Sequence, residues 1–281
     1  MAQCDVCFRH CDIPEGRRGF CGARACVDGV VVDDNYGRIT ALALDPIEKK
    51  PLRRFHPGGV ILSVGSYGCN LRCPFCQNHD ISWSAAAMAC ADSAETIAPE
   101  ELVRLAIHYR SHGNIGLAFT YNEPLIDWEF VRDAAKLSHE AGLLNVLVTN
   151  GTAEVHVLEA LAPYIDAMNI DLKGFTERYY RDVLGGDFAM VKAFITRAAE
   201  LCHVELTTLI VPGENDGEEE MRALSEWVSR LGSADGSVPL HISRFFPRFH
   251  MTDRPATDVS LIYHLADAAR ENLRYVYTGN C

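Results

Sequence analysis

Three cysteines, Cys69, Cys73 and Cys76, lie in one short loop, with three and then two residues between them. The loop directly follows the apolar run 60–64. Such tight spacing allows three thiolates to converge on one metal centre from a single loop. Three thiolates would leave one iron of a cubane iron–sulfur cluster open to an external ligand, whereas four would close the coordination sphere. The loop therefore predicts a metal centre with an open, reactive position.

Two other interpretations of this loop compete with the cluster. A zinc site could combine the three thiolates with a fourth ligand, for which His79 is the candidate. Disulfide bonds are disfavoured, because cysteines so close in sequence form strained or impossible bridges.

A second set of cysteines stands at the start of the chain. Cys4, Cys7, Cys11 and Cys21 follow one another with two, three and nine intervening residues, and Cys26 is left over. Their surroundings are polar and glycine-rich, so we expect a bound metal to stabilise this segment. Four thiolates suit either tetrahedral zinc or an auxiliary iron–sulfur cluster, and the spacing does not decide between them.

Composition and charge limit the class of protein. The 281 residues suffice for one large α/β domain with a small appendage, and 48% hydrophobic content is ordinary for a globular core. A net charge of −12 argues against nucleic acid or an anionic membrane as the main partner. No apolar run approaches the roughly 18 residues of a membrane span, and the N-terminus does not resemble a signal peptide. We expect a cytoplasmic protein whose eleven cysteines serve metal sites rather than disulfides.

Short apolar runs alternate with amphipathic segments over most of the chain. The runs expected to form strands are 60–64, 117–120, 145–149, 167–171, 204–211 and 240–244. The segments expected to form helices are 100–112, 127–141, 153–161, 188–201, 218–230 and 257–272. Strand alternating with helix predicts a parallel sheet, and six repeats with right-handed crossovers predict a partial, TIM-like (β/α)6 barrel.

The chain is expected to have two parts. A small N-terminal cysteine-rich, metal-binding extension occupies residues 1–56, and the core barrel occupies residues 57–281. Within the extension, 29–32 and 38–44 are expected to pair as a β-hairpin, and 45–52 to form a solvated link.

Polar residues follow the predicted strands at the end where such barrels place their chemistry. They are Asn122 and Glu123 after the second strand, Asn150 after the third, and Asp171 with Lys173 at the fourth. Each has an ordinary explanation alone, since Glu123 could cap the next helix and Asp171 could pair with Lys173 at the surface. Their occurrence in register with the cysteine loop predicts one polar site.

These motifs resemble those of a known superfamily. The cysteine loop, with Phe75 just before its last cysteine, resembles the signature of the radical S-adenosylmethionine (radical SAM) superfamily. Residues 121–124 and 171–173 extend the resemblance to the branch that contains the glycyl-radical-enzyme activases. Stretches similar to the radical SAM member of the AmmeMemoRadiSam system are the N-terminal cysteine cluster and residues 45–51, 241–245 and 277–280.

The resemblance implies cofactors and the residues that hold them. Cys69, Cys73 and Cys76 would bind a [4Fe–4S] cluster whose open iron is chelated by the methionine moiety of SAM. Contacts to SAM would come from Phe75, Asn122, Glu123, Asn150, Asp171 and Lys173. Among them, Phe75 would lie against the adenine, and Glu123 would accept from the methionine ammonium.

The resemblance also implies an activity. The enzyme would cleave SAM reductively to methionine and a 5′-deoxyadenosyl radical, which removes hydrogen from an unidentified substrate. Flavodoxin or ferredoxin would donate the electron, and a protein is one candidate substrate. A narrower alternative is an activase that installs a glycyl radical on a partner enzyme.

Other interpretations stay open at this point. A non-catalytic, zinc-binding interaction protein on the same barrel is the alternative from a different class. RNA modification is disfavoured by the acidic composition. The four residues His241, Arg244, Arg248 and His250 could bind an acidic substrate or form a solvated basic face.

Overall fold

The computed structural model describes residues 1–91, 94–232 and 237–281. The strands of its main sheet are β6 (Ala41–Pro46), β7 (Val60–Gly65), β9 (Asn114–Phe119), β10 (Leu144–Thr149), β11 (Ala167–Asp171), β12 (His203–Ile210), β13 (Leu240–Arg244) and β14 (Val276–Gly279). They lie side by side in the order β14-β13-β12-β11-β10-β9-β7-β6.

The main sheet is parallel from β7 to β14, and β6 alone runs antiparallel to its neighbour. All six predicted strands are present, which confirms an α/β fold with a parallel sheet. Strand β14 is a seventh parallel strand that the sequence did not indicate, because only four residues form it. Among the described strands, β6 and β14 are the two edges of this sheet, so the predicted barrel is open between them.

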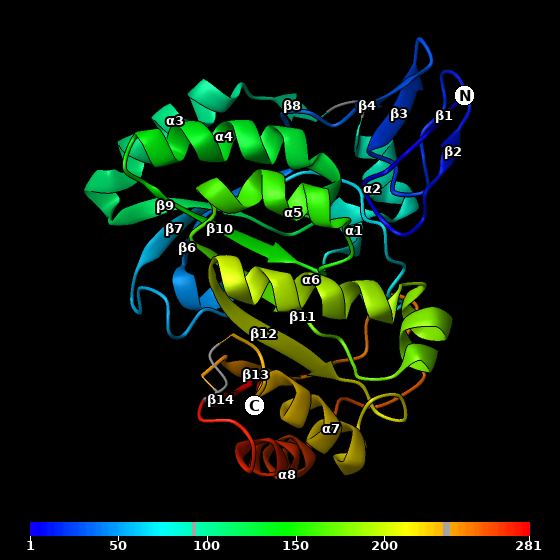
Figure 1. Ribbon diagram of the computed structural model, residues 1–281, viewed down its shortest axis with the longest axis vertical. Coiled ribbons are helices and arrows are strands. Elements are labelled where there is room, and N and C mark those ends of the chain that lie inside the picture. The colour runs from blue at the N-terminus through cyan, green and yellow to red at the C-terminus, as the bar shows by residue number, and fades with distance from the viewer. Residues whose placement is uncertain (92–93, 233–236) are drawn as a thin grey trace.

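Helices cover one face of the sheet, as Figure 1 shows for α3 to α8. The helices are α1 (His79–Ser82), α2 (Ala85–Cys90), α3 (Pro99–His108), α4 (Trp128–Glu140), α5 (Val155–Leu161), α6 (Phe188–Leu201), α7 (Glu218–Val228) and α8 (Val259–Arg270). Short helical turns are η1 (Ile47–Lys49), η3 (Tyr109–His112), η4 (Pro124–Asp127), η5 (Ala162–Tyr164) and η6 (Tyr179–Leu184). The six predicted helical segments correspond to α3 to α8. Aspartate side chains at Asp187 and Asp258 cap α6 and α8 by accepting from backbone N–H groups of the first turn.

The link after β6 closes the amino-terminal end of the sheet instead of lying in solvent as expected. Ile47 and Leu52 are fully buried against Ile61 and other apolar residues of the central strands. The Lys50 ammonium lies 2.9 Å from Asp45, and both side chains are largely shielded from water. The link is therefore part of the core.

The predicted N-terminal hairpin pairs with different partners. Strand β4 (Val30–Asp33) pairs with β3 (Arg24–Val27), while 38–39 forms β5 (Arg38–Ile39), which pairs with β8 (Glu95–Thr96). The reason is a two-residue turn at Asp28-Gly29, where both residues have positive φ, as tight hairpin turns require. The first strands, β1 (Ala2–Gln3) and β2 (Asp12–Ile13), form a separate pair.

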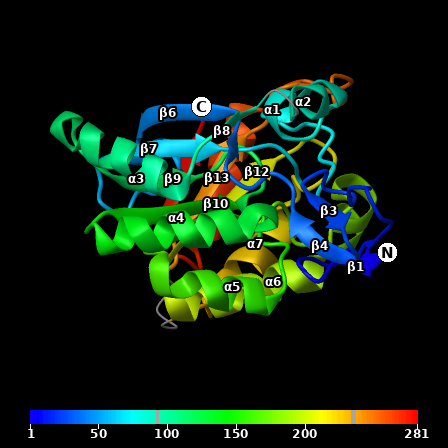
Figure 2. The same ribbon diagram turned by 90° about the horizontal axis from the view of Figure 1, so that it is seen from above.

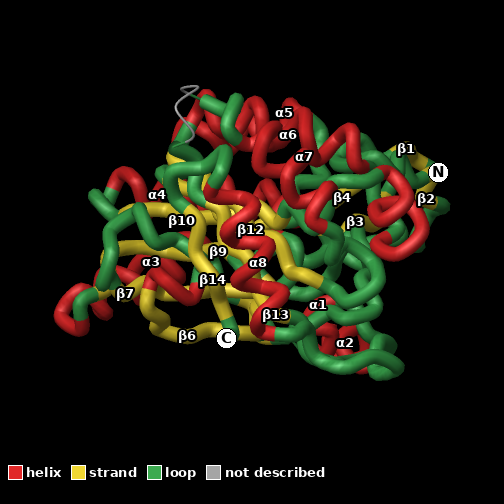
Figure 3. Tube along the Cα trace, turned by 90° about the horizontal axis from the view of Figure 1, so that it is seen from below, coloured by secondary structure: helices red, strands yellow, loops and turns green. Residues whose placement is uncertain are grey.

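The N-terminal segment lies at the carboxyl ends of the central strands. Figure 1 shows β1 to β4 at the edge toward which the β10 and β12 arrows point. Figure 2 and Figure 3 show α1 and α2 at the same end, on the side of the sheet away from α5 and α6. The expected boundary between residues 56 and 57 falls between β6 and β7, which pair with each other. Within the described residues, no helix is both long and apolar enough to cross a membrane.

Candidate functional site

The cysteine loop leaves β7 at the carboxyl edge of the sheet. Gly68 has φ of 94°, and a Cβ there would meet the Ile126 side chain at 2.8 Å, so glycine is required at this bend. The backbone N–H of Leu71 points at the Cys69 sulfur at 3.4 Å. The N–H of Cys76 donates to the Cys73 carbonyl at 3.1 Å, which closes the loop on itself.

Two asparagines fasten the loop to the end of β10. The Asn150 amide donates to the Asn70 side chain at 2.9 Å and lies 3.8 Å from the Cys69 sulfur. Asn70 in turn donates to the Thr152 carbonyl at 2.8 Å and is almost fully buried. The structure therefore brings the predicted residue Asn150 to the cysteine loop. The role of Asn70 was missed, although a polar residue next to Cys69 was the signal for it.

Glu123 follows β9 and lies beside the carboxyl end of the neighbouring strand β10. Its carboxylate accepts from Leu125 N at 3.0 Å, Thr149 Oγ1 at 2.6 Å and Asn150 N at 2.8 Å. It caps η4, as one interpretation expected, and also ties β9 to β10. Burial raises the pKa of Glu123 to about 7, against the opposing effect of these hydrogen bonds. Since each carboxylate oxygen accepts two bonds, Oε2 keeps one acceptor position.

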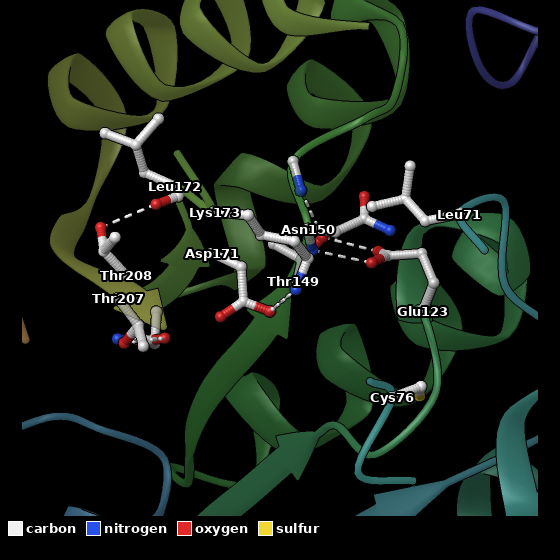
Figure 4. A network of polar contacts seen from close by, with 12 residues as sticks. Leu71, Cys76, Glu123, Thr149, Asn150, Asp171, Leu172, Lys173, Thr207 and Thr208 are labelled. Atoms are coloured by element: carbon white, nitrogen blue, oxygen red, sulfur yellow. Dashed lines mark hydrogen bonds and ion pairs between the residues drawn. The ribbon is translucent and has the colours of Figure 1, made fainter. Parts of the chain in front are cut away.

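Asp171 and Lys173 form an ion pair at the end of β11. The Lys173 ammonium lies 2.8 Å from Asp171, and Figure 4 shows the pair beside the Glu123, Thr149 and Asn150 cluster. Burial alone would lower the pKa of Lys173, but the Asp171 carboxylate and the Cys73 thiolate raise it above its usual value. Lys173 therefore keeps a positive charge close to Cys73.

The remaining predicted residues take different places. Asn122 uses its amide to accept from Ser66 N at 3.0 Å and to donate to the Tyr67 carbonyl at 3.2 Å. It thus supports the approach to the cysteine loop. Phe75 is buried within that loop, with its ring edge-on to Phe245 at a centroid distance of 6.3 Å.

An aromatic segment after β13, residues 245–251, covers the cysteine loop, a role that was not predicted for it from the sequence. The Phe249 ring stacks on His79 at 4.2 Å, so His79 is engaged by this segment. The N–H of His250 donates to the Pro74 carbonyl at 2.9 Å, and Arg248 donates to the Gln77 carbonyl at 3.3 Å. This segment therefore holds the loop from the side opposite the sheet.

His241 lies apart from this site. It is buried near the amino end of β13, and its ring nitrogen Nε2 lies 2.6 Å from the fully buried Glu205. Glu205 also accepts from the backbone N–H groups of Arg53 and Arg54. The expected basic group around the last strand is therefore divided, with only Arg248 and His250 beside the cysteine loop.

The four N-terminal cysteines also come together. Cys4, Cys7, Cys11 and Cys21 line one cavity, whereas Cys26 lies outside its lining. Burial raises the pKa of Cys7 to about 11, and it also raises the pKa of Cys4 and Cys21.

The donor sets fit iron–sulfur chemistry. Burial raises the pKa of Cys73 to about 11 and that of Cys69 well above its usual value, so a positively charged metal is needed to stabilise their thiolates. Within residues 1–91, 94–232 and 237–281, no three His, Cys, Asp or Glu side chains are grouped so as to hold a single metal ion. A cubane does not need so tight a group, since each thiolate binds a different iron. The N–H groups directed at the Cys69 sulfur suit a negatively charged cluster.

Two curated proteins are similar to the chain in sequence. An uncharacterized protein of Methanocaldococcus jannaschii is 39% identical over 282 residues, covering 99% of this chain and 81% of that protein. The pyruvate formate-lyase 1-activating enzyme of Escherichia coli is 24% identical over 174 residues, covering 60% of this chain and 68% of the enzyme.

A solved structure has a similar fold. Streptococcus suis SuiB bound to S-adenosylmethionine matches with a TM-score of 0.59 at 13% identity, covering 79% of this chain and 52% of that chain. SuiB bound to its precursor peptide SuiA matches with a TM-score of 0.57 at 14% identity, covering 76% and 47%. The present chain thus spans about half the length of SuiB.

The family match settles the class of protein. The model of the radical SAM superfamily matches residues 63–225, which is more than half of the chain and includes the cysteine loop. Members of this superfamily are enzymes, which favours an enzyme over a non-catalytic zinc-binding protein on the same barrel. The finer resemblance to the AmmeMemoRadiSam system stays a prediction. The chain belongs to the radical SAM superfamily, whose enzymes use a [4Fe–4S] cluster and S-adenosylmethionine.

Proposed function

We propose that this enzyme cleaves SAM reductively at the cysteine loop and uses the product to remove hydrogen from a polypeptide substrate. Cys69, Cys73 and Cys76 would hold the [4Fe–4S] cluster. The observation that carries the proposal is the convergence of this loop with the polar ends of β9, β10 and β11. When bound, the cluster and SAM supply one-electron cleavage of the sulfonium and an adenosyl radical that abstracts hydrogen.

The protein residues would orient SAM and support the cluster. The free acceptor position of Glu123 would take a hydrogen bond from the methionine ammonium, which carries a positive charge. Lys173, held by Asp171, offers an ammonium to the carboxylate or ribose of SAM. Asn150 would direct its amide at the Cys69 sulfur, where it favours a negatively charged cluster.

One role differs from the role that the resemblance implied, and another is extended to a second residue. Asn122 would act indirectly, because its amide already bonds to the backbone at Ser66 and Tyr67. The Phe75 ring packs against the Phe245 ring. We therefore assign both rings to the side of the site where the adenine would lie.

A polypeptide is the substrate class that we favour. The names of two similar proteins point to polypeptides: one is a pyruvate formate-lyase 1-activating enzyme, and the other, SuiB, is bound to its precursor peptide. In the described part of the chain, β6 and β14 are unpaired edges of the main sheet, so the strands do not close into a full barrel. The exposed Phe246 ring, in the segment that covers the cysteine loop, would meet such a partner.

A glycyl-radical activase is the second candidate. It is favoured by the 24% identity to the pyruvate formate-lyase 1-activating enzyme. Such an activase would require a partner enzyme that presents a glycine loop to the open barrel.

The test of the chemistry is SAM cleavage by anaerobically reconstituted protein. With dithionite as reductant, we expect 5′-deoxyadenosine and methionine from the native chain and neither product from Cys73→Ala. The matched control is Cys202→Ala, which removes a thiol at the carboxyl end of α6, directly before the amino end of β12, and should leave cleavage intact. Cleavage by Cys73→Ala at the native rate would contradict the proposal.

The test of the substrate class is isotope transfer. Extract from cells grown in heavy water is separated into protein and small-molecule fractions, and each is supplied to the reaction. Deuterium in recovered 5′-deoxyadenosine from the protein fraction alone supports a polypeptide substrate. Deuterium from the small-molecule fraction alone would exclude it.

A further inference from the structure

The N-terminal cysteines form a second thiol site next to the first. Cys4, Cys7, Cys11 and Cys21 surround one cavity, and Arg9 and Arg24 contribute to its lining. The fifth cysteine of this segment, Cys26, is fully buried elsewhere, with its thiol 3.4 Å from Glu15. The four thiols line one shared cavity, and within the described residues no three His, Cys, Asp or Glu side chains are grouped tightly enough to hold a single ion, which suits a cluster better than one tetrahedral ion.

This second site is joined directly to the cysteine loop. The backbone N–H of Cys69 donates to the Cys21 carbonyl at 3.2 Å. A Cβ on Gly68 would come within 3.0 Å of that same carbonyl, so the two segments are in close contact. The Arg9 guanidinium, which lines the cavity, donates to the Asn70 carbonyl at 2.8 Å. One backbone hydrogen bond therefore links a residue of each thiol set.

Positive charge gathers between the two sets. The Arg9 and Arg72 guanidinium groups lie over the Phe20 ring at 3.4 and 3.9 Å from its centroid. Arg72 also donates to the Cys69 carbonyl at 2.6 Å. Such groups stabilise the extra negative charge of a reduced cluster. Phe20 is 41% exposed, so this junction reaches the protein surface.

We propose that Cys4, Cys7, Cys11 and Cys21 hold a second iron–sulfur cluster, which relays electrons to the cluster on the Cys69 loop. A flavodoxin- or ferredoxin-type protein would be oxidised by one electron at the exposed side. The second cluster would be reduced and then reoxidised as the electron passes to the first. No bond forms or breaks and no proton moves in this transfer. Zinc could not serve here, because it has no redox chemistry. The relay role rests on the proposed SAM cleavage, whereas the cluster itself does not.

The first experiment measures metal content and spectra of anaerobically reconstituted protein. We expect about eight iron per chain in the native protein and about four in Cys4→Ser and Cys11→Ser, since each [4Fe–4S] cluster contains four. These two cysteines are chosen because the backbone hydrogen bond that Cys69 donates to the N-terminal set is accepted by Cys21 and not by either of them. Cys26→Ser is the matched control and should keep the native iron content. Zinc at the N-terminal site, with about four iron per chain, would overturn the proposal.

The second experiment separates the relay from the chemistry. SAM cleavage is measured with dithionite and with flavodoxin reduced by its reductase. Cys11→Ser should keep most of its dithionite-driven rate and lose most of its flavodoxin-driven rate, and Cys26→Ser should keep both. Equal loss of both rates in Cys11→Ser would overturn the relay. A native protein with two clusters but no cleavage under either reductant would refute the proposed function instead, and leave the second cluster standing.

Discussion

Replacing Glu123 by Gln isolates the charge that we assign to the SAM ammonium. Glutamine has the same size, but one of its two terminal atoms becomes an NH2 group that cannot accept hydrogen bonds. If the NH2 group takes the place of Oε2, the side chain can no longer accept the hydrogen bond from Asn150 N, and the free acceptor position is lost as well. A hydrogen bond to a charged group contributes about 1.5–3 kcal/mol. We therefore expect SAM affinity to fall roughly 10- to 150-fold, since 1.36 kcal/mol is a factor of ten.

The assay is anaerobic equilibrium binding of SAM, with thermal unfolding measured in parallel. The matched control is Glu205→Gln, because Glu205 is also fully buried and accepts from two backbone N–H groups, but lies near the amino end of β12. That control should lose stability and keep SAM affinity. Unchanged SAM affinity in Glu123→Gln, with its fold intact, would refute the assignment.

The same residue gives a pH dependence with a definite sign. Burial raises the pKa of Glu123 to about 7, and only the carboxylate form can pair with an ammonium. SAM affinity should therefore increase as pH rises through about 7, and this increase should be absent in Glu123→Gln. The free energy of unfolding should change in the opposite direction. Because the pKa of Glu123 is raised in the folded state, its contribution to stability decreases as pH rises through about 7.

Three further changes test other parts of the site. Cys73→Ala should abolish SAM cleavage together with the cluster absorbance, and full cleavage without a cluster would contradict the assignment. Asn150→Ala should lower the midpoint potential of the cluster, because it removes an N–H group 3.8 Å from the Cys69 sulfur; an unchanged redox titration monitored by electron paramagnetic resonance would argue against that contact. Burial raises the pKa of Asp33 to about 6 beside Asp127, so native stability should fall as pH rises through about 6. Asp33→Asn should flatten this dependence and raise stability at neutral pH in denaturant unfolding, and retention of the native pH dependence would count against this pair.

The sheet was predictable because its central strands are buried on both faces. Such strands appear in sequence as nearly continuous apolar runs, and 167–171 is matched to the residue by β11. The helices were predictable from their periodicity and caps, and α6 has the predicted bounds. The antiparallel pairing of β6 could not be predicted, because β-pairing depends on distant partners rather than on the strand's own sequence.

The N-terminal hairpin shows where local chemistry was overlooked. Asp28-Gly29 is a strong two-residue turn signal, yet the hairpin was placed between 29–32 and 38–44. The link 45–52 was mistaken for a solvated connector because of its charges. Lys50 is nevertheless buried, since its ammonium pairs with Asp45.

The sequence predicted which residues form the site better than it predicted the contacts that those residues make. The residue types indicated that Glu123, Asn150, Asp171 and Lys173 would gather beside the cysteine loop, and they do. That Asn122 bonds to the backbone instead of facing the site depends on the path of residues 66–67. No periodicity in the sequence encodes such a path, and the covering segment 245–251 was missed for the same reason.

The most direct test of the account is whether SAM binds an iron that the protein leaves open. Reconstituted native protein is mixed with SAM that carries nitrogen-15 in its amino group. The sample is then reduced and studied by electron–nuclear double resonance. The account predicts a hyperfine coupling between the label and a cluster held by Cys69, Cys73 and Cys76. A cluster with no such coupling, or with a fourth side chain bound at that iron, would contradict it.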